Sequence, residues 1–325
     1  MKIVFNLGAG RKLDIAPLRE RFPEHSFVET RGAAEVAREL GDAEVLIISN
    51  RPYFRDMVEA VNGNAGALKW IQFTTSGIDK ALKNGGFPKG VTVTNCSGLS
   101  APILAEHAIA LLLFLSRRFR DTQAAAARRD WLRDEISPSV NALAGRTMAV
   151  CGMGATGQEV ARKARAFGMK VIGVSRAYKP DDLVEEVYPR ERAKEALARA
   201  DAVVLSMPAT PETKGFINRD TLGAMKKTAF VVNVARGDLV DEADLVAACR
   251  AGVIGGAGLD VTVTEPTPAD SPLWDVPNIV LTPHIAATGY DSTPRLMEML
   301  AENLSLYLAG KPLKRVLDWE RMAAD

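Results

Sequence analysis

Three side chains in the second half of the chain have the chemistry to move a proton and hold a small anion. Arg236, Glu265 and His284 each follow a short apolar run typical of a buried strand. An arginine offers a planar fork that matches a carboxylate or an adjacent keto oxygen. A histidine gives or takes the proton that accompanies a hydride transfer, and a neighbouring carboxylate favours its charged form. Taken singly, the three also fit a surface charge, a turn cap and a structural histidine. Since His25 lies in a polar loop and His107 in an apolar helix, His284 is the best acid/base candidate.

A glycine-rich turn precedes these residues and predicts a second kind of site. Residues 149–157 read AVCGMGATG, which places Gly152, Gly154 and Gly157 in the spacing G-x-G-x-x-G. An apolar run comes before the turn, and a helical pattern and a second apolar run follow it, as in a βαβ unit. The amides of Gly154, Ala155, Thr156 and Gly157 would then bind a diphosphate at the helix N-terminus.

The end of the second strand of this unit bears on the choice of cofactor. NAD-binding proteins commonly place an acidic residue there for the ribose 2′-hydroxyl. This chain has Ser175 and Arg176, with Lys179 nearby. A hydroxyl and a guanidinium group suit a phosphate, so we expect NADP with NAD possible, the alternative being an ordinary solvated basic loop.

Composition and charge exclude several classes of partner. The 325 residues hold 41 Lys and Arg against 40 Asp and Glu, a net charge of +1, so we expect neither nucleic acid nor a membrane as partner. The sequence has no secretory leader pattern and no apolar run long enough to cross a bilayer, which predicts a cytoplasmic protein. We expect no metal, because the cysteines lack metal-ligand spacing; they are Cys96, Cys151 and Cys249.

The order of apolar runs and helical patterns predicts an α/β fold with two Rossmann-like, doubly wound parallel-sheet domains and an active site in the cleft between them. We expect residues 1–99 with 289–325 to form a flavodoxin-like substrate-binding domain. Residues 100–288 would form the dinucleotide-binding Rossmann domain. The helix expected over 101–119 is apolar on nearly all faces, and with the stretch through Trp131 it predicts a homodimer.

With these motifs in order, nearly the whole chain resembles the D-isomer-specific 2-hydroxyacid dehydrogenase family, in particular its glyoxylate/hydroxypyruvate reductases. The segments that carry the resemblance are GLSAPILAEHAIALLL (98–113), GRTMAVCGMGATG (145–157), PATPETKGFIN (208–218), FVVNVARGDLVDEADLVAA (230–248), GGAGLDVTVTEP (255–266) and PLWDVPNIVLTPHIAA (272–287).

The resemblance implies a role for each matching residue. Arg236 would orient the substrate, His284 would be the acid/base and Glu265 would tune it. Backbone amides of Ser76 and Gly77 would bind the substrate carboxylate. The cofactor would be lined by Ser206, Met207, Pro208 and Thr213, and its nicotinamide end by Val234, Ala235, Arg236 and Asp260.

The expected reaction is therefore reduction of a small 2-keto acid to the D-2-hydroxy acid with NAD(P)H. Two alternatives stay open: a cofactor-sensing protein like the co-repressors that share this fold, and phosphite-type oxidation on the same scaffold. Glu265 stands where the resembling formate enzymes have Gln, which argues against formate. Thr262 departs from the aromatic residue common in the family. Arg51 and Tyr53 are candidates for contacting the substrate side chain, or ordinary loop residues.

Overall fold

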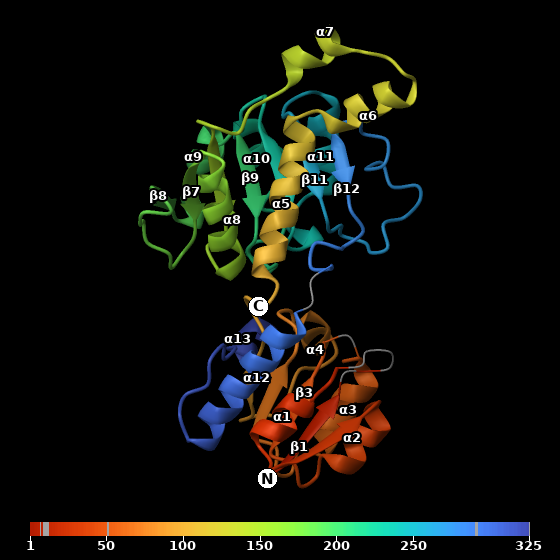
Figure 1. Ribbon diagram of the computed structural model, residues 1–325, viewed down its shortest axis with the longest axis vertical. Coiled ribbons are helices and arrows are strands. Elements are labelled where there is room, and N and C mark those ends of the chain that lie inside the picture. The colour runs from red at the N-terminus through yellow and green to blue at the C-terminus, as the bar shows by residue number, and fades with distance from the viewer. Residues whose placement is uncertain (7, 9–12, 51, 290–291, 325) are drawn as a thin grey trace. The chain divides into compact units, whose positions relative to one another are not determined.

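The computed structural model describes residues 1–6, 8, 13–50, 52–289 and 292–324 (Figure 1). The chain forms two compact units, Met1–Leu99 with Asp291–Asp325, and Ser100–Tyr290. The chain thus enters the second unit once and returns to the first. The expected return, at residue 289, lies two residues before the observed one.

The first unit is built on a parallel sheet of five strands in the order β2-β1-β3-β4-β5. Alternate residues of its strands face two separate cores: Ile3 and Phe5 pack with α1 and α12, whereas Val4 packs with α2 and α3. Helices therefore cover both faces of the sheet. Its strands are β1 (Lys2–Asn6), β2 (Ser26–Thr30), β3 (Val45–Ile48), β4 (Trp70–Phe73) and β5 (Thr92–Thr94), and its helices are α1 (Ala16–Arg21), α2 (Ala33–Glu39), α3 (Arg55–Gly63), α4 (Asp79–Lys83), α12 (Thr293–Leu308) and α13 (Trp319–Ala324).

The second unit has a parallel sheet of seven strands in the order β12-β11-β10-β9-β6-β7-β8. Met148 and Val150 of β6 face α5 and α8, which lie side by side in Figure 1, and Ala149 and Cys151 face α9, α10 and α11. The strands are β6 (Thr147–Cys151), β7 (Lys170–Val174), β8 (Glu186–Tyr188), β9 (Ala202–Leu205), β10 (Phe230–Asn233), β11 (Gly256–Leu259) and β12 (Ile279–Leu281). The helices are α5 (Ala101–Ser116), α6 (Phe119–Ala127), α7 (Arg133–Ile136), α8 (Ala155–Ala166), α9 (Ala193–Arg199), α10 (Arg219–Ala224) and α11 (Glu242–Arg250), with short 3₁₀ turns at Ser137–Ser139, Arg190–Arg192 and Gly237–Leu239.

Two doubly wound parallel sheets were predicted and are confirmed, but some element bounds differ. The helix expected over 101–119 ends at Ser116, because Arg118 adopts a left-handed conformation with φ 57° before α6 begins. Strand β8 was not predicted; it has only three residues and lies at the edge of the sheet. None of the helices in the described residues is both long and apolar enough to cross a membrane.

Candidate functional site

The glycine-rich turn between β6 and α8 is packed backbone against backbone. Gly152 has φ +99°, and a Cβ there would lie 2.6 Å from the Met207 amide nitrogen. A Cβ on Gly157 would lie 1.9 Å from the Gly152 carbonyl oxygen. Both positions therefore require glycine: the first for a left-handed turn and the second for close packing of helix and strand.

The middle glycine of the motif, Gly154, faces open space instead. A Cβ on Gly154 would meet nothing within 4 Å, and Gly154 caps the twelve-residue helix α8 with no side chain bound to the first-turn amides. The amides of Ala155 and Thr156 are thus left at the positive end of the helix dipole. An open approach to uncapped amides is the arrangement that a diphosphate requires, so the residues present fit a dinucleotide cofactor.

The loop after β9 is hydrogen-bonded to this turn and stabilises it. Ser206 Oγ donates to the Gly152 carbonyl oxygen at 2.8 Å. Further along, Thr213 Oγ1 donates to the Pro208 carbonyl oxygen at 2.9 Å and accepts from the Thr210 amide at 2.8 Å. Of the residues predicted to line the cofactor, Ser206 and Thr213 thus use their hydroxyl groups to shape the loop, and the backbone of Met207 lies against Gly152.

At the carboxyl end of β7, Ser175 forms a tight turn. Its hydroxyl accepts from the Tyr178 amide at 3.2 Å. The neighbouring guanidinium group of Arg176 lies 3.4 Å from Glu212 Oε2, and Arg190 lies 2.7 Å from the same oxygen. Arg190 and Glu212 belong to loops after two other strands and were not predicted from the sequence.

His284 and Glu265 form a hydrogen-bonded pair. His284 Nδ1 lies 2.7 Å from Glu265 Oε2, and the Thr262 amide donates to Glu265 Oε1 at 3.3 Å. A carboxylate at Nδ1 orients the ring and leaves Nε2 for proton exchange. The pair lines a cavity of about 570 Å³ whose other walls include Trp274 and Pro283. His284 itself has φ +54°, a conformation that is rare for a residue other than glycine.

Asp260 fixes the loop that carries His284. Its carboxylate is 2% exposed and accepts hydrogen bonds from Thr282 Oγ1 at 2.6 Å and from the Ile285 and Ala286 amides at 2.9 Å each. His107 Nε2 lies 2.9 Å from Thr282 Oγ1. Since the threonine proton is donated to Asp260, the histidine is the donor in this contact. His107 Nε2 also lies 3.4 Å from Asp260 Oδ1, so His107 is tied to the site through both Thr282 and Asp260. Thr282 was not predicted from the sequence.

Arg236 belongs to a loop held by the end of β10. Asn233 Nδ2 donates to the Arg236 carbonyl oxygen at 2.8 Å and Asn233 Oδ1 accepts from the Ala235 amide at 3.0 Å. The Val234 side chain is buried in the core. A Cβ on Gly237 would lie 2.1 Å from the Thr262 carbonyl carbon, so the loops that carry Arg236 and Glu265 are in backbone contact.

In the first unit, the loop after β4 is held by its carbonyl groups. Asn95 Nδ2 donates to the Ser76 carbonyl oxygen at 2.6 Å, and Thr75 Oγ1 donates to that of Gly77 at 3.0 Å. Within the described part of the chain, no hydrogen bond is donated by either amide of these two residues. The loop therefore has amides to offer an anion.

The structure describes only one of the two candidate residues after β3. Arg51 lies outside the described residues. Tyr53 is fully buried, with its ring 5.6 Å from the rings of both Phe73 and Phe87. A side chain packed in this aromatic core is placed to stabilise the unit, which does not fit the expectation that Tyr53 contacts the substrate side chain.

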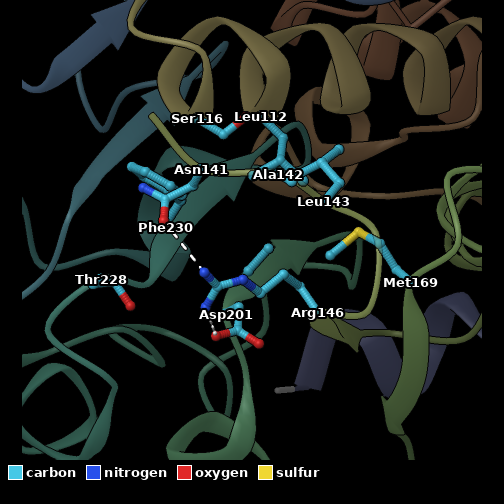
Figure 2. A pocket seen from close by; sticks show the side chains of 11 residues that line it. Leu112, Ser116, Asn141, Ala142, Leu143, Arg146, Met169, Asp201, Thr228 and Phe230 are labelled. Atoms are coloured by element: carbon cyan, nitrogen blue, oxygen red, sulfur yellow. Dashed lines mark hydrogen bonds and ion pairs between the residues drawn. The ribbon is translucent and has the colours of Figure 1, made fainter. Parts of the chain in front are cut away.

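A small pocket at the amino-terminal ends of β6, β9 and β10 is structural (Figure 2). At about 10 Å³, it has room for a single water molecule. Figure 2 shows Arg146 between Asp201 and Asn141, with Nη1 3.3 Å from Asp201 Oδ1. Lys226 Nζ also lies 3.0 Å from this carboxylate. Over the described ranges, no three or more His, Cys, Asp or Glu side chains are grouped so that they could hold a metal ion.

Fold and site together define a Rossmann-type protein with a dinucleotide cradle and a carboxylate–imidazole pair. Residues 109–286 match the family model described as "D-isomer specific 2-hydroxyacid dehydrogenase, NAD binding domain". The chain belongs to this family of nicotinamide-dependent oxidoreductases.

Two of the curated relatives match over most of their own length. The chain is 32% identical over 308 residues to a glycerate dehydrogenase of Methylorubrum extorquens, covering 91% of this chain and 94% of the relative. It is 31% identical to a hydroxypyruvate reductase of Blautia hydrogenotrophica, covering 87% of each. Among solved structures, an NADPH-dependent glyoxylate/hydroxypyruvate reductase of Sinorhizobium meliloti in complex with NADP and sulfate has a TM-score of 0.83 at 28% identity, with 99% of both chains covered.

Proposed function

We propose that this protein reduces a small 2-keto acid, of the glyoxylate or hydroxypyruvate type, to the D-2-hydroxy acid with NADPH as the preferred cofactor. The observation that carries the proposal is the pairing of His284 Nδ1 with Glu265 Oε2 at 2.7 Å beside a cavity of about 570 Å³. The names of the relatives support the substrate class. The basic residues after β7 support the choice of NADPH over NADH.

Different residues of the chain would bind the cofactor, donate the proton and orient the proton donor. Gly154, Ala155 and Thr156 would hold the cofactor diphosphate, and the bound nicotinamide supplies a hydride to the carbonyl carbon. His284 holds a proton at Nε2 and delivers it to the carbonyl oxygen, while Glu265 keeps the ring in place through Nδ1. Fixing donor and acceptor before the reaction removes much of its entropic barrier.

The substrate carboxylate requires cationic or amide donors. We assign this role to the guanidinium group of Arg236, whose fork matches a carboxylate or keto oxygen. Ser76 and Gly77 of the first unit would add their amides, which is consistent with the absence of other hydrogen bonds from these amides within the described residues. Arg236 would then hold the substrate with its carbonyl group towards His284.

The test is an assay of NADPH oxidation with glyoxylate, hydroxypyruvate, pyruvate, phenylpyruvate and branched keto acids. His284→Ala should lower kcat by about 10²- to 10⁴-fold, since general acid catalysis contributes that much. Cofactor affinity, measured by fluorescence titration, should stay near the wild-type value. His25→Ala, the same change in the first unit beside the chain's amino group, is the control. Wild-type turnover in the His284 variant, or an inactive wild type across the panel, would refute the proposal.

We also propose that the protein is a homodimer assembled through the segment from α6 to residue 140. Trp131 is 91% exposed and lies at a groove of about 480 Å³ between α6 and α7. An exposed indole of this kind is typical of a residue that is covered by a partner. Sedimentation equilibrium showing a monomer at micromolar concentration would remove this proposal. A cytoplasmic location stays a prediction from the sequence.

A further inference from the structure

Three loops at one edge of the second sheet place two guanidinium groups on a single carboxylate oxygen. Arg176 follows β7, Arg190 follows β8 and Glu212 lies in the loop after β9. Arg190 Nη1 is 2.7 Å and Arg176 Nη1 is 3.4 Å from Glu212 Oε2. Since the strands are parallel, their carboxyl ends meet at the edge where Gly154 faces open space.

The charges of this cluster do not balance. Two guanidinium groups and one carboxylate leave one positive charge in excess. Neighbouring arginines are paired one to one: Arg192 makes two bonds of 2.7 and 2.6 Å to Glu195. Arg199 likewise makes bonds of 2.7 and 2.8 Å to Glu186. The surplus therefore belongs to the pair that shares Glu212.

The position of Glu212 Oε2 marks a point that both guanidinium groups reach at once. The Arg190 side chain is 29% exposed and thus held against the protein, whereas that of Arg176 is 66% exposed and can follow a ligand. The Ser175 turn fixes the backbone next to Arg176. A site with one anchored and one adaptable cation suits an anion that carries several oxygens.

We propose that Arg190, together with Arg176, binds the 2′-phosphate of NADP(H), and that Glu212 is an internal counter-ion which this phosphate displaces. The inference rests on the proposed use of NADPH. Arg190 and Glu212 are thereby specificity-determining residues for the cofactor. In the absence of a 2′-phosphate, the two arginines stay paired with Glu212.

The chemistry of the two anions explains why the phosphate prevails. A phosphate monoester carries about −1.5 to −2 charges at pH 7 and three acceptor oxygens, against one charge and two oxygens for a carboxylate. Each guanidinium group can then form its own charge-assisted bonds rather than share one oxygen. A ribose 2′-hydroxyl has no charge with which to compete for the arginines, so NAD(H) leaves the cluster closed.

Adenosine 2′,5′-bisphosphate and adenosine 5′-monophosphate isolate this site, because both carry the adenosine and the 5′-phosphate and differ only at the 2′ position. Calorimetric titration of the wild-type protein should give at least about tenfold tighter binding of the bisphosphate, the value of a charge-assisted contact. Arg190→Ala should abolish about tenfold of that preference and leave monophosphate binding unchanged. Glu212→Gln should strengthen bisphosphate binding several-fold, because it removes the competing charge and keeps the side-chain shape.

Two matched variants control for loss of charge in the same region. Arg192→Ala and Glu195→Gln break a neighbouring ion pair that does not involve Glu212, and both should bind the probes as the wild type does. The proposal is overturned if Arg190→Ala keeps the wild-type preference, or if Glu212→Gln weakens bisphosphate binding. Because these titrations use no keto acid, they separate this inference from the proposed reaction. An inactive enzyme with the expected binding pattern refutes only the reaction, and an active enzyme without it refutes only the assignment of Arg190 and Glu212.

Discussion

Replacing Asp260 by Asn tests whether this carboxylate positions the loop that carries His284. Asp260 Oδ1 accepts from Thr282 Oγ1 and the Ile285 amide, and Oδ2 accepts from the Ala286 amide. An ionised carboxylate offers about four acceptor positions, of which these donors fill three, and His107 Nε2 lies 3.4 Å from Oδ1. Asparagine of the same size keeps the oxygen that meets Thr282 and Ile285, but turns an amino group towards the Ala286 amide.

The free energy lost in Asp260→Asn follows from the burial of the carboxylate. A hydrogen bond to a charged acceptor contributes about 1.5–3 kcal/mol, and a side chain that is 2% exposed gains nothing back from water. Losing the Ala286 bond and opposing two donors should therefore destabilise the ordered loop by about 2–3 kcal/mol. If that free energy is lost from the reactive arrangement of His284, kcat/KM falls by roughly 30- to 150-fold.

The assay is kcat/KM for glyoxylate with saturating NADPH, together with thermal unfolding of each variant. Thr288→Val is the control, because it removes a neutral bond of the same loop, from Thr288 Oγ1 to the Ile285 carbonyl oxygen at 2.7 Å, and leaves all three bonds to Asp260. Less than about a fivefold loss is expected, since a neutral hydrogen bond contributes about 1 kcal/mol. If Asp260→Asn unfolds at a lower temperature while kcat/KM stays unchanged, the carboxylate stabilises the fold without positioning His284, and the reasoning fails.

Two further predictions concern groups away from the reaction. Burial disfavours the charge of Asp201, but the Thr147 amide, Lys226 and Arg146 outweigh it and lower the pKa of this carboxyl. Asp201→Asn should therefore lower the free energy of unfolding in urea by about 1–2 kcal/mol at pH 7. This difference from the wild type should shrink as the pH falls below about 4, through the folded-state pKa. An equal difference at pH 7 and pH 3.5 would contradict this sign. Burial raises the pKa of all three cysteine thiols to about 12, so at pH 8 only about 10⁻⁴ of each is thiolate. A disulfide reagent should therefore label none of them within minutes in the native protein, but all three in guanidinium chloride. Rapid labelling of the native protein would show that a thiol is accessible.

The parts of the site that could be predicted from the sequence are those set by neighbours in the chain. The glycine turn depends on nine consecutive residues between an apolar strand and a helix, and each glycine has a separate backbone requirement. The fold class was predictable for the same reason, because buried parallel strands are continuous apolar runs. Strand β8 lacks such a run: Glu186 is exposed and only Tyr188 is buried. Its pairing with β7 is decided by the sheet, not by its own composition.

Interactions between loops could not be predicted. Arg190 and Glu212 are 22 residues apart and meet only because two strand ends lie at one edge of the sheet. Charged residues in loops carry no periodicity, so nothing in their spacing distinguishes them from a solvated surface. Tyr53 is the converse case, a residue predicted to contact the substrate that is instead buried. Its ring packs against those of Phe73 and Phe87, which the loop sequence alone does not indicate.

The contact between Gly237 and Thr262 bears on how the anion site and the proton donor stay aligned. The loop before Gly237 carries Arg236, and the loop after Thr262 carries Glu265, which holds His284. Because a Cβ at position 237 would lie 2.1 Å from the Thr262 carbonyl carbon, neither loop can approach or rotate without moving the other. The separation of the two loop backbones is thus set by direct contact, which varies less than a contact between long side chains. A methyl group at Gly237 would therefore force apart the loop that carries Arg236 and the loop that carries Glu265.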